Sequence, residues 1–142
     1  MIVLDTGGLY AALDANEALH ERCAAILASV RPPRVLSPFV LAELEHIVAE
    51  RGGSEAQSAL LEEVVEGAYR LEPFTTDDID RAKRVMKTYG DLRIGLADAS
   101  VVVLAMRYRT LDLLCTDERH FRALRGPGGK SFRLLPADAS VG

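Results

Sequence analysis

Short apolar segments that alternate with amphipathic segments are the feature that most constrains the fold of this chain. The strand-like segments end at polar or turn-forming residues and lie at 1–4, 34–36, 69–72, 111–116 and 132–134. The intervening segments carry apolar residues at helical spacing and lie at 17–30, 38–51, 54–66, 76–89 and 94–108. This alternation predicts an α/β domain with a largely parallel central sheet, flanked by helices on both faces.

Local sequence sets several boundaries within this pattern. Ser37 followed by Pro38 is typical of an N-cap and a first helical residue. Gly52-Gly53 predicts the end of that helix, and Thr76 is the expected cap of the helix over 76–89. We expect Thr6-Gly7-Gly8 to form a tight turn before a helical stretch from 9 to 13.

Length and composition are those of a globular protein with an ordinary core. With 142 residues, of which 49% are hydrophobic, the chain is expected to form a single domain over 1–142. No basic, apolar leader and no membrane-length apolar run is present, which predicts a cytoplasmic protein without a membrane partner. The isolated Cys23 and Cys115 are expected to be small core residues in a reducing compartment.

The net charge of −4 does not suggest a simple basic nucleic-acid binder, but the charge is unevenly distributed. Residues 119–137 contain no acid and five basic side chains, and a second basic cluster falls within the helix over 76–89. Such segments either present a basic face to phosphates or are ordinary solvated surface.

Asp98 is the acid that physical chemistry singles out. On a helix over 94–108 its neighbours on the same face are apolar: Ile94, Val101, Val102 and Ala105. A carboxylate in such a stripe is unfavourable unless it is paired, bound to a metal or open to a solvent-filled groove.

Asp5 and Asp117 each follow a predicted strand. In parallel α/β sheets, ligands bind beyond the carboxyl ends of the strands, where strand order reverses, so both side chains can reach such a crevice. The alternative for each acid is an N-cap that accepts backbone hydrogen bonds from the helix that follows.

A fourth acid comes from the helix that begins near Pro38. With Leu44 at the centre of its apolar stripe, Glu43 and Glu45 flank that stripe on either side, and helical periodicity does not choose between them. Clustered carboxylates repel one another and need a counter-charge, for which a hard divalent cation such as Mg²⁺ or Mn²⁺ is suited.

Other catalytic layouts have little support. His20, His46 and His120 lack the spacing of zinc ligands and are expected on the surface or in loops, with only His120 near the carboxylates. Neither a P-loop nor a dinucleotide-binding glycine motif is present. A receiver domain would need an acidic pair near its first strand, and a dehalogenase-type domain a D-x-D pattern, which Asp5-Thr6-Gly7 lacks.

Four blocks of sequence resemble the PIN-domain family, and in particular its VapC-type toxins of toxin–antitoxin systems. In order, the blocks are Ile2-Val3-Leu4-Asp5-Thr6, Ser37-Pro38-Phe39-Val40-Leu41-Ala42-Glu43-Leu44, Leu96-Ala97-Asp98-Ala99-Ser100 and Leu114-Cys115-Thr116-Asp117-Glu118-Arg119-His120-Phe121. The resemblance spans essentially the whole chain. Gly7 and Gly8 depart from it, because family members often carry a serine or another polar residue there.

The resemblance selects Glu43 over Glu45 and implies that Asp5, Glu43 and Asp98 bind metal, with Asp117 completing the site. It also implies supporting hydroxyls, from Thr6, Thr116 and Ser100. Arg119 and Arg122 are candidate RNA-binding residues.

The implied activity is endonucleolytic RNA hydrolysis with Mg²⁺ or Mn²⁺ as cofactor. The implied partners are tRNA or ribosomal RNA as substrate, a VapB-type antitoxin and a second copy of the chain in a homodimer. Two alternatives stay open: a PIN nuclease that processes RNA without an antitoxin, and a degenerate PIN domain that only binds a protein partner.

Overall fold

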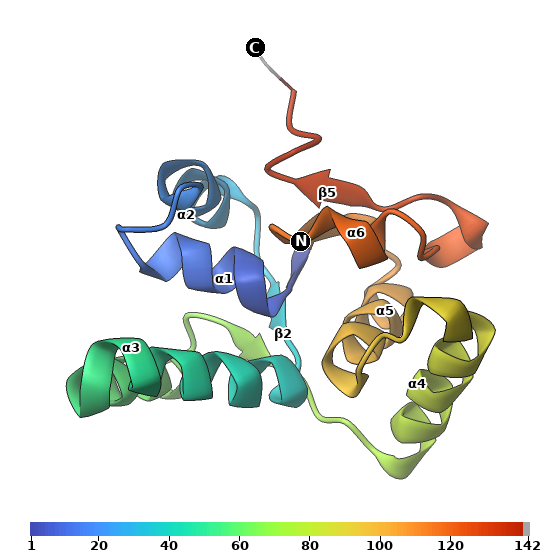
Figure 1. Cartoon of the computed structure of the whole chain (residues 1–142), viewed down its shortest axis with the longest axis horizontal. Coiled ribbons are helices and arrows are strands. Elements are labelled where there is room, and N and C mark those ends of the chain that lie inside the picture. Colours follow the sequence, from blue (N-terminus) through green and yellow to red (C-terminus); the bar gives the residue numbers. More distant parts are fainter. Residues whose placement is uncertain (141–142) are drawn as a thin grey trace.

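A five-stranded parallel sheet forms the centre of the protein in a computed structural model that describes residues 1–140 (Figure 1). The strands follow the spatial order β3-β2-β1-β4-β5. Their bounds are β1 Ile2–Leu4, β2 Arg34–Leu36, β3 Arg70–Leu71, β4 Asp112–Leu114 and β5 Arg133–Leu135. All neighbouring pairs are parallel, which confirms the predicted sheet.

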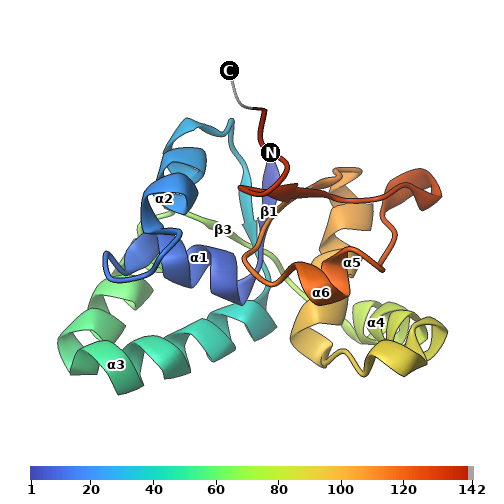
Figure 2. The same cartoon turned by 45° about the horizontal axis from the view of Figure 1, so that its top comes forward.

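Helices cover both faces of this sheet. They are α1 Thr6–Leu13, α2 His20–Ser29, α3 Pro38–Val65, α4 Thr76–Thr88, α5 Leu96–Tyr108 and α6 Glu118–Phe121, with short 3-10 turns at Gly90–Leu92 and Pro127–Gly129. In both views, α1 and α2 lie on one side of the strands, and α4 and α5 lie on the other (Figures 1 and 2). This arrangement confirms the α/β architecture expected from the sequence.

Strand order reverses between β1 and β4. The chain adds β2 and then β3 on one side of β1, and β4 then pairs with the other side of β1. Leu4 at the end of β1 lies in register with Leu114 at the end of β4. Asp5 and Asp117 therefore follow the two strands that border the switch point, where α/β sheets place their ligands.

The predicted turn at 6–8 is wrong, because α1 begins directly at Thr6. Gly8 is needed where that helix packs against β4. A Cβ added at Gly8 would lie 2.4 Å from the backbone oxygen of Leu114, so only glycine allows α1 to cross β4 this closely.

Two helix boundaries refine the sequence expectations. The range Pro38–Val65 consists of two helical segments that meet at a kink, because Gly53 has the non-helical φ 77° and ψ −173°. The kink lies where Gly52-Gly53 predicted the end of the first helix. The cap of α4 is Thr75, one residue before the expected Thr76. Thr75 and Asp78 form a capping box, in which each side chain accepts from the backbone N–H of the other residue.

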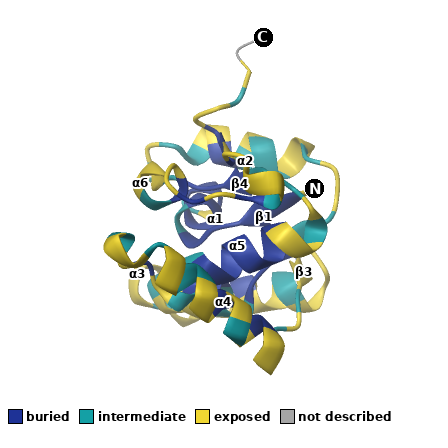
Figure 3. Ribbon diagram, turned by 90° about the vertical axis from the view of Figure 1, so that its right-hand side faces the viewer, coloured by how far each residue is buried: buried dark blue, intermediate teal, exposed yellow. Residues whose placement is uncertain are grey.

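The core is formed by the strands and by α5, which is buried along most of its length (Figure 3). The fully buried Val101, Leu104 and Ala105 of α5 pack in the same core as Val3 and Leu113 of the sheet. Cys23 and Cys115 are buried free thiols, as expected. Within residues 1–140, no helix is both long and apolar enough to cross a membrane.

Candidate active site

Asp5 lies between β1 and α1 at the edge of the core, and only 6% of it is exposed. It occupies the N-cap position of α1, but its side chain makes no capping hydrogen bond. Burial, together with the negative charges of Asp98 and Glu43, raises the pKa of its carboxyl to about 7, although the backbone N–H groups of Thr6 and Gly7 oppose the shift. Burial and the neighbouring acids therefore outweigh any capping contribution at this carboxyl.

Asp98 lies in the first turn of α5, where the helix dipole favours a negative charge. Its side chain is 25% exposed, so it lies at the rim of the core rather than inside it. Burial raises its pKa, while a contact of 3.1 Å between its Oδ2 and Nδ1 of His120 opposes that shift. The negative charges of Glu43 and Asp117 also raise the pKa of Asp98.

Glu43 comes from the second turn of α3. Its Oε1 accepts a hydrogen bond of 2.8 Å from the hydroxyl of Thr6, the first residue of α1. Glu45, which periodicity left equivalent, instead accepts from Gln57 in the second half of α3. The two glutamates thus face different surroundings, and Glu43 is the one near Asp5.

Asp117 lies beyond the end of β4, at the N-cap of α6. Its Oδ1 accepts a hydrogen bond of 3.0 Å from the backbone N–H of Arg119. Asp117 therefore does cap α6, as the alternative interpretation expected. Its charge also raises the pKa of Asp98. A carboxylate has further acceptor sites beyond one capping bond, so this cap does not prevent a second role.

The electrostatic coupling of these acids is the main property of the site. Asp5 and Asp98 each have a pKa raised by burial and by other acids of the group, which means that the metal-free protein holds them ionised only at a cost. Among residues 1–140, no three His, Cys, Asp or Glu side chains already surround a point that would hold an ion. The donor set is nevertheless purely carboxylate, which fits a hard divalent cation such as Mg²⁺ or Mn²⁺.

The expected supporting hydroxyls lie in three different settings. Thr6 contacts Glu43 directly, as described above. Thr116 packs against α1, where its Oγ1 would lie 2.5 Å from a Cβ added at Gly7. Ser100 contacts none of the four acids: its hydroxyl lies 2.6 Å from that of Ser37, at the N-cap of α3.

The two arginines proposed for RNA binding also differ. Arg122 donates to Glu118 and to both carboxylate oxygens of Asp138, so intramolecular ion pairs occupy its guanidinium. Arg119 is exposed, and no acid of residues 1–140 lies within ion-pair distance of its side chain.

Sequence reasoning did not assign two side chains that hold the site together. His120 was expected on the surface, yet its ring contacts Asp98. Ser37 was expected only as a cap, yet it also bonds to Ser100. The position of His120, three residues after Asp117 on a short helix, was the available signal for its contact with the carboxylates.

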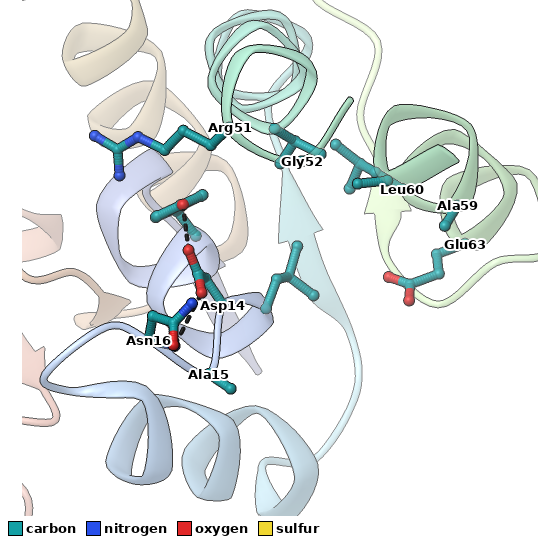
Figure 4. Close-up of a pocket in the computed structure, with 12 residues that line it drawn as sticks. Asp14, Ala15, Asn16, Arg51, Gly52, Ala59, Leu60 and Glu63 are labelled. Atoms are coloured by element: carbon teal, nitrogen blue, oxygen red, sulfur yellow. Dashed lines mark hydrogen bonds between the residues drawn. The ribbon is translucent and has the colours of Figure 1, made fainter. Parts of the chain in front are cut away.

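A separate pocket of about 410 Å³ lies near the other end of α1 (Figure 4). Its lining includes Asp14 at the C-cap of α1, together with Arg51 and Leu60 from the two halves of α3. None of the four candidate acids lines it. The pocket lies toward the C-terminal end of α1, whereas Asp5 directly precedes the first residue of that helix.

Comparisons with known proteins agree with this architecture. The PIN domain family model matches residues 2–127. The chain is 43% identical over 135 residues to "Ribonuclease VapC26" of Mycobacterium tuberculosis (strain ATCC 25618 / H37Rv), which covers 95% of this chain and 100% of that protein.

Two solved structures share the fold. The crystal structure of Mycobacterium tuberculosis VapC20, described as a "Sarcin-Ricin loop cleaving toxin", superposes with a TM-score of 0.77 at 22% identity, over 84% of this chain and 92% of that chain. FitAcB from Neisseria gonorrhoeae superposes with a TM-score of 0.55 at 25% identity, over 77% of this chain and 83% of that chain. The protein therefore belongs to the PIN-domain family and is a relative of its VapC ribonucleases.

Proposed function

We propose that this protein is a metal-dependent endoribonuclease that acts as the toxin of a VapBC-type toxin–antitoxin pair. The observation that carries the proposal is the coupled carboxylate group at the switch point, in which burial and neighbouring acids raise the pKa of Asp5 to about 7. The 43% identity to a VapC ribonuclease over nearly the whole chain supports the same activity.

In this proposal, Asp5, Asp98, Glu43 and Asp117 hold Mg²⁺ or Mn²⁺. The bound cation would neutralise these acids and supply Lewis acidity toward the RNA phosphate and the attacking water. The hydroxyl of Thr6 holds Glu43 by donating to its Oε1. The backbone N–H of Arg119 donates to Oδ1 of Asp117, and this capping bond holds the start of α6 beside the site.

The proposed substrate is a structured RNA, such as tRNA or ribosomal RNA. Arg119 is positioned next to the Asp117 cap and is the stronger candidate for a phosphate contact, because the guanidinium of Arg122 is already paired. The further proposed partners are a VapB-type antitoxin and a second copy of the chain in a homodimer.

The first test compares RNA cleavage by the purified wild-type protein and by Asp98→Asn. We expect Mg²⁺- or Mn²⁺-dependent cleavage by the wild type. The variant should lose more than the roughly 10–100-fold that is typical when a group supporting a metal ligand is removed. Asp91→Asn is the matched control, because Asp91 is an exposed acid in the 3-10 turn just before α5. Undiminished cleavage by Asp98→Asn, or by wild type in excess chelator, would contradict the proposed mechanism.

The second test identifies the substrate. The chain is expressed in cells without an antitoxin, and RNA 5′ ends are sequenced after induction. We expect new 5′ ends at a few sites in tRNA or ribosomal RNA with the wild type and none with Asp98→Asn. A small neighbouring reading frame whose product has a DNA-binding N-terminus is the candidate antitoxin gene. Its co-expression should prevent the appearance of the new RNA 5′ ends.

A further inference from the structure

Within residues 1–140, His120 is the one histidine that touches the candidate carboxylates. Its Nδ1 lies 3.1 Å from Oδ2 of Asp98, and the two side chains are 23% and 25% exposed. An ionised carboxylate only accepts hydrogen bonds, so the proton of this contact belongs to Nδ1. The contact crosses from α6 to α5, between segments 22 residues apart in the sequence.

The backbone around His120 is held from both sides. Before it, Asp117 caps α6 through the N–H of Arg119. After it, Phe121 is 2% exposed and belongs to the hydrophobic core. The ring therefore extends from a short helix that is anchored at both ends, which limits how far Nδ1 can move from Asp98.

The other two histidines have different contacts. His20 bonds through Nδ1 to the backbone oxygen of Ala11. His46 lies 3.4 Å from Glu50 on the surface of α3, with both side chains more than half exposed. The pair of His46 and Glu50 offers a matched example of a histidine–carboxylate contact outside the site.

We infer that His120 is a positioning residue for Asp98: its Nδ1–H holds Oδ2, so that the carboxylate of Asp98 is kept in one orientation toward the divalent cation. The inference rests on the proposed function, because it assumes that Asp98 binds the cation. Carboxylate ligands are commonly held by such hydrogen bonds, and loss of the supporting group typically weakens metal binding by 10–100-fold, as an order of magnitude.

The amide of asparagine and that of glutamine separate this role from simple packing. The Nδ2 of asparagine reaches about the place of Nδ1 of histidine, whereas the amide of glutamine reaches about the place of Nε2. His120→Asn should therefore keep the bond to Asp98, and His120→Gln and His120→Ala should lose it. A role in packing alone would not follow this order.

The experiment measures Mn²⁺ binding by isothermal titration calorimetry for the wild type, these three variants and the control His46→Asn. Urea unfolding of each metal-free protein verifies that it is folded. We expect His120→Ala and His120→Gln to bind Mn²⁺ roughly 10-fold or more weakly, while His120→Asn stays within about 3-fold of the wild type. His46→Asn should bind as the wild type does. At saturating Mn²⁺, RNA cleavage by His120→Ala should recover most of the wild-type rate, because the residue acts through the metal ligand.

Two results would overturn the inference in distinguishable ways. If the wild type binds Mn²⁺ and His120→Ala binds it equally well, or His120→Asn is no better than His120→Ala, the positioning role is wrong and the proposed function stands. If the wild type binds no Mn²⁺, the proposed metal-dependent function fails, and the positioning role fails with it. Should His120→Ala not fold, the comparison of His120→Asn with His120→Gln decides.

Discussion

The hydroxyls of Ser37 and Ser100 lie 2.6 Å apart in the interior, where both residues are fully buried. The hydroxyl of Ser100 donates its proton to the backbone oxygen of Ala97, and the hydroxyl oxygen of Ser37 accepts from the N–H of Phe39. These two bonds assign the direction of the shared one, in which Ser37 donates to Ser100. The chain of bonds ties the start of α3, which carries Glu43, to the first turns of α5, which carry Asp98.

This relationship predicts that Ser100→Ala loosens the site as well as the fold. The variant leaves the hydroxyl of Ser37 buried without its acceptor, which costs about 1–3 kcal/mol of unfolding free energy. Urea unfolding measures this loss. RNA cleavage should fall in the folded variant, because the helices that carry Glu43 and Asp98 lose their direct bond.

Ser29→Ala is the control, since Ser29 is an exposed helical serine whose hydroxyl bonds only to the backbone of its own helix. Its unfolding free energy should change by less than about 0.5 kcal/mol. Equal stability of Ser100→Ala and Ser29→Ala would show that the bond between the two helices contributes nothing.

The raised pKa of Asp5 makes the stability of the metal-free protein depend on pH. Its folded pKa of about 7 lies above the ordinary value of 3.8, so between these values the folded chain holds a proton that the unfolded chain has lost. The unfolding free energy therefore falls as pH rises through this window, by up to about 1.4 kcal/mol per pH unit, and levels off above pH 7.

Asp5→Asn removes this titration. In chelator, the variant should gain stability over the wild type as pH rises from 4 to 7, and the difference should stay constant above that window. Urea unfolding at several pH values measures the difference. A constant difference across the whole range would mean that the carboxyl of Asp5 titrates with the same pKa in the folded and the unfolded protein.

The sequence predicted the sheet and the strand-end acids because these depend on local patterns: apolar segments of strand length, and polar residues directly after them. It did not predict the pairing of Ser37 with Ser100 or of His120 with Asp98, since each contact joins segments that are distant in the sequence. Periodicity alone also left Glu43 and Glu45 equivalent. Glu43 bonds to Thr6 and Glu45 bonds to Gln57, and the fold brings both of these partners near.

The misjudged turn at 6–8 has a related cause. Glycine pairs usually mark turns, because turns often need backbone conformations that other residues avoid. Gly7 and Gly8 serve another need, which is the space between α1 and β4. Only the packing of a helix against a strand more than 100 residues away reveals that need.

Gly8→Ala is expected to destabilise the protein. Its Cβ would lie 2.4 Å from the backbone oxygen of Leu114, and a strand carbonyl cannot rotate away, so α1 must move off β4. Such overpacking costs about 1–3 kcal/mol. At the upper end of that range, the cost exceeds the gain of about 1 kcal/mol that alanine brings in helix propensity.

Thermal or urea unfolding tests this prediction. Gly90→Ala is the control, because a Cβ at Gly90 meets nothing within 4 Å. A Gly8→Ala variant as stable as Gly90→Ala would contradict the close approach.

Substitution of Arg119, on α6, and of Arg122, directly after it, should change the salt dependence of RNA binding to different extents. RNA binding is measured in the Asp98→Asn background, where cleavage does not interfere, over a range of salt concentrations. Arg119→Ala should weaken binding and lower the slope of log affinity against log salt by about 1, as expected for one lost phosphate contact. Arg122→Ala should leave the slope nearly unchanged, because Glu118 and Asp138 already pair with the guanidinium of Arg122. The variant should still be folded, since such half-exposed ion pairs contribute at most about 1 kcal/mol to stability. An equal loss of slope in both variants would mean that RNA displaces the acids from Arg122, and that both arginines face the substrate.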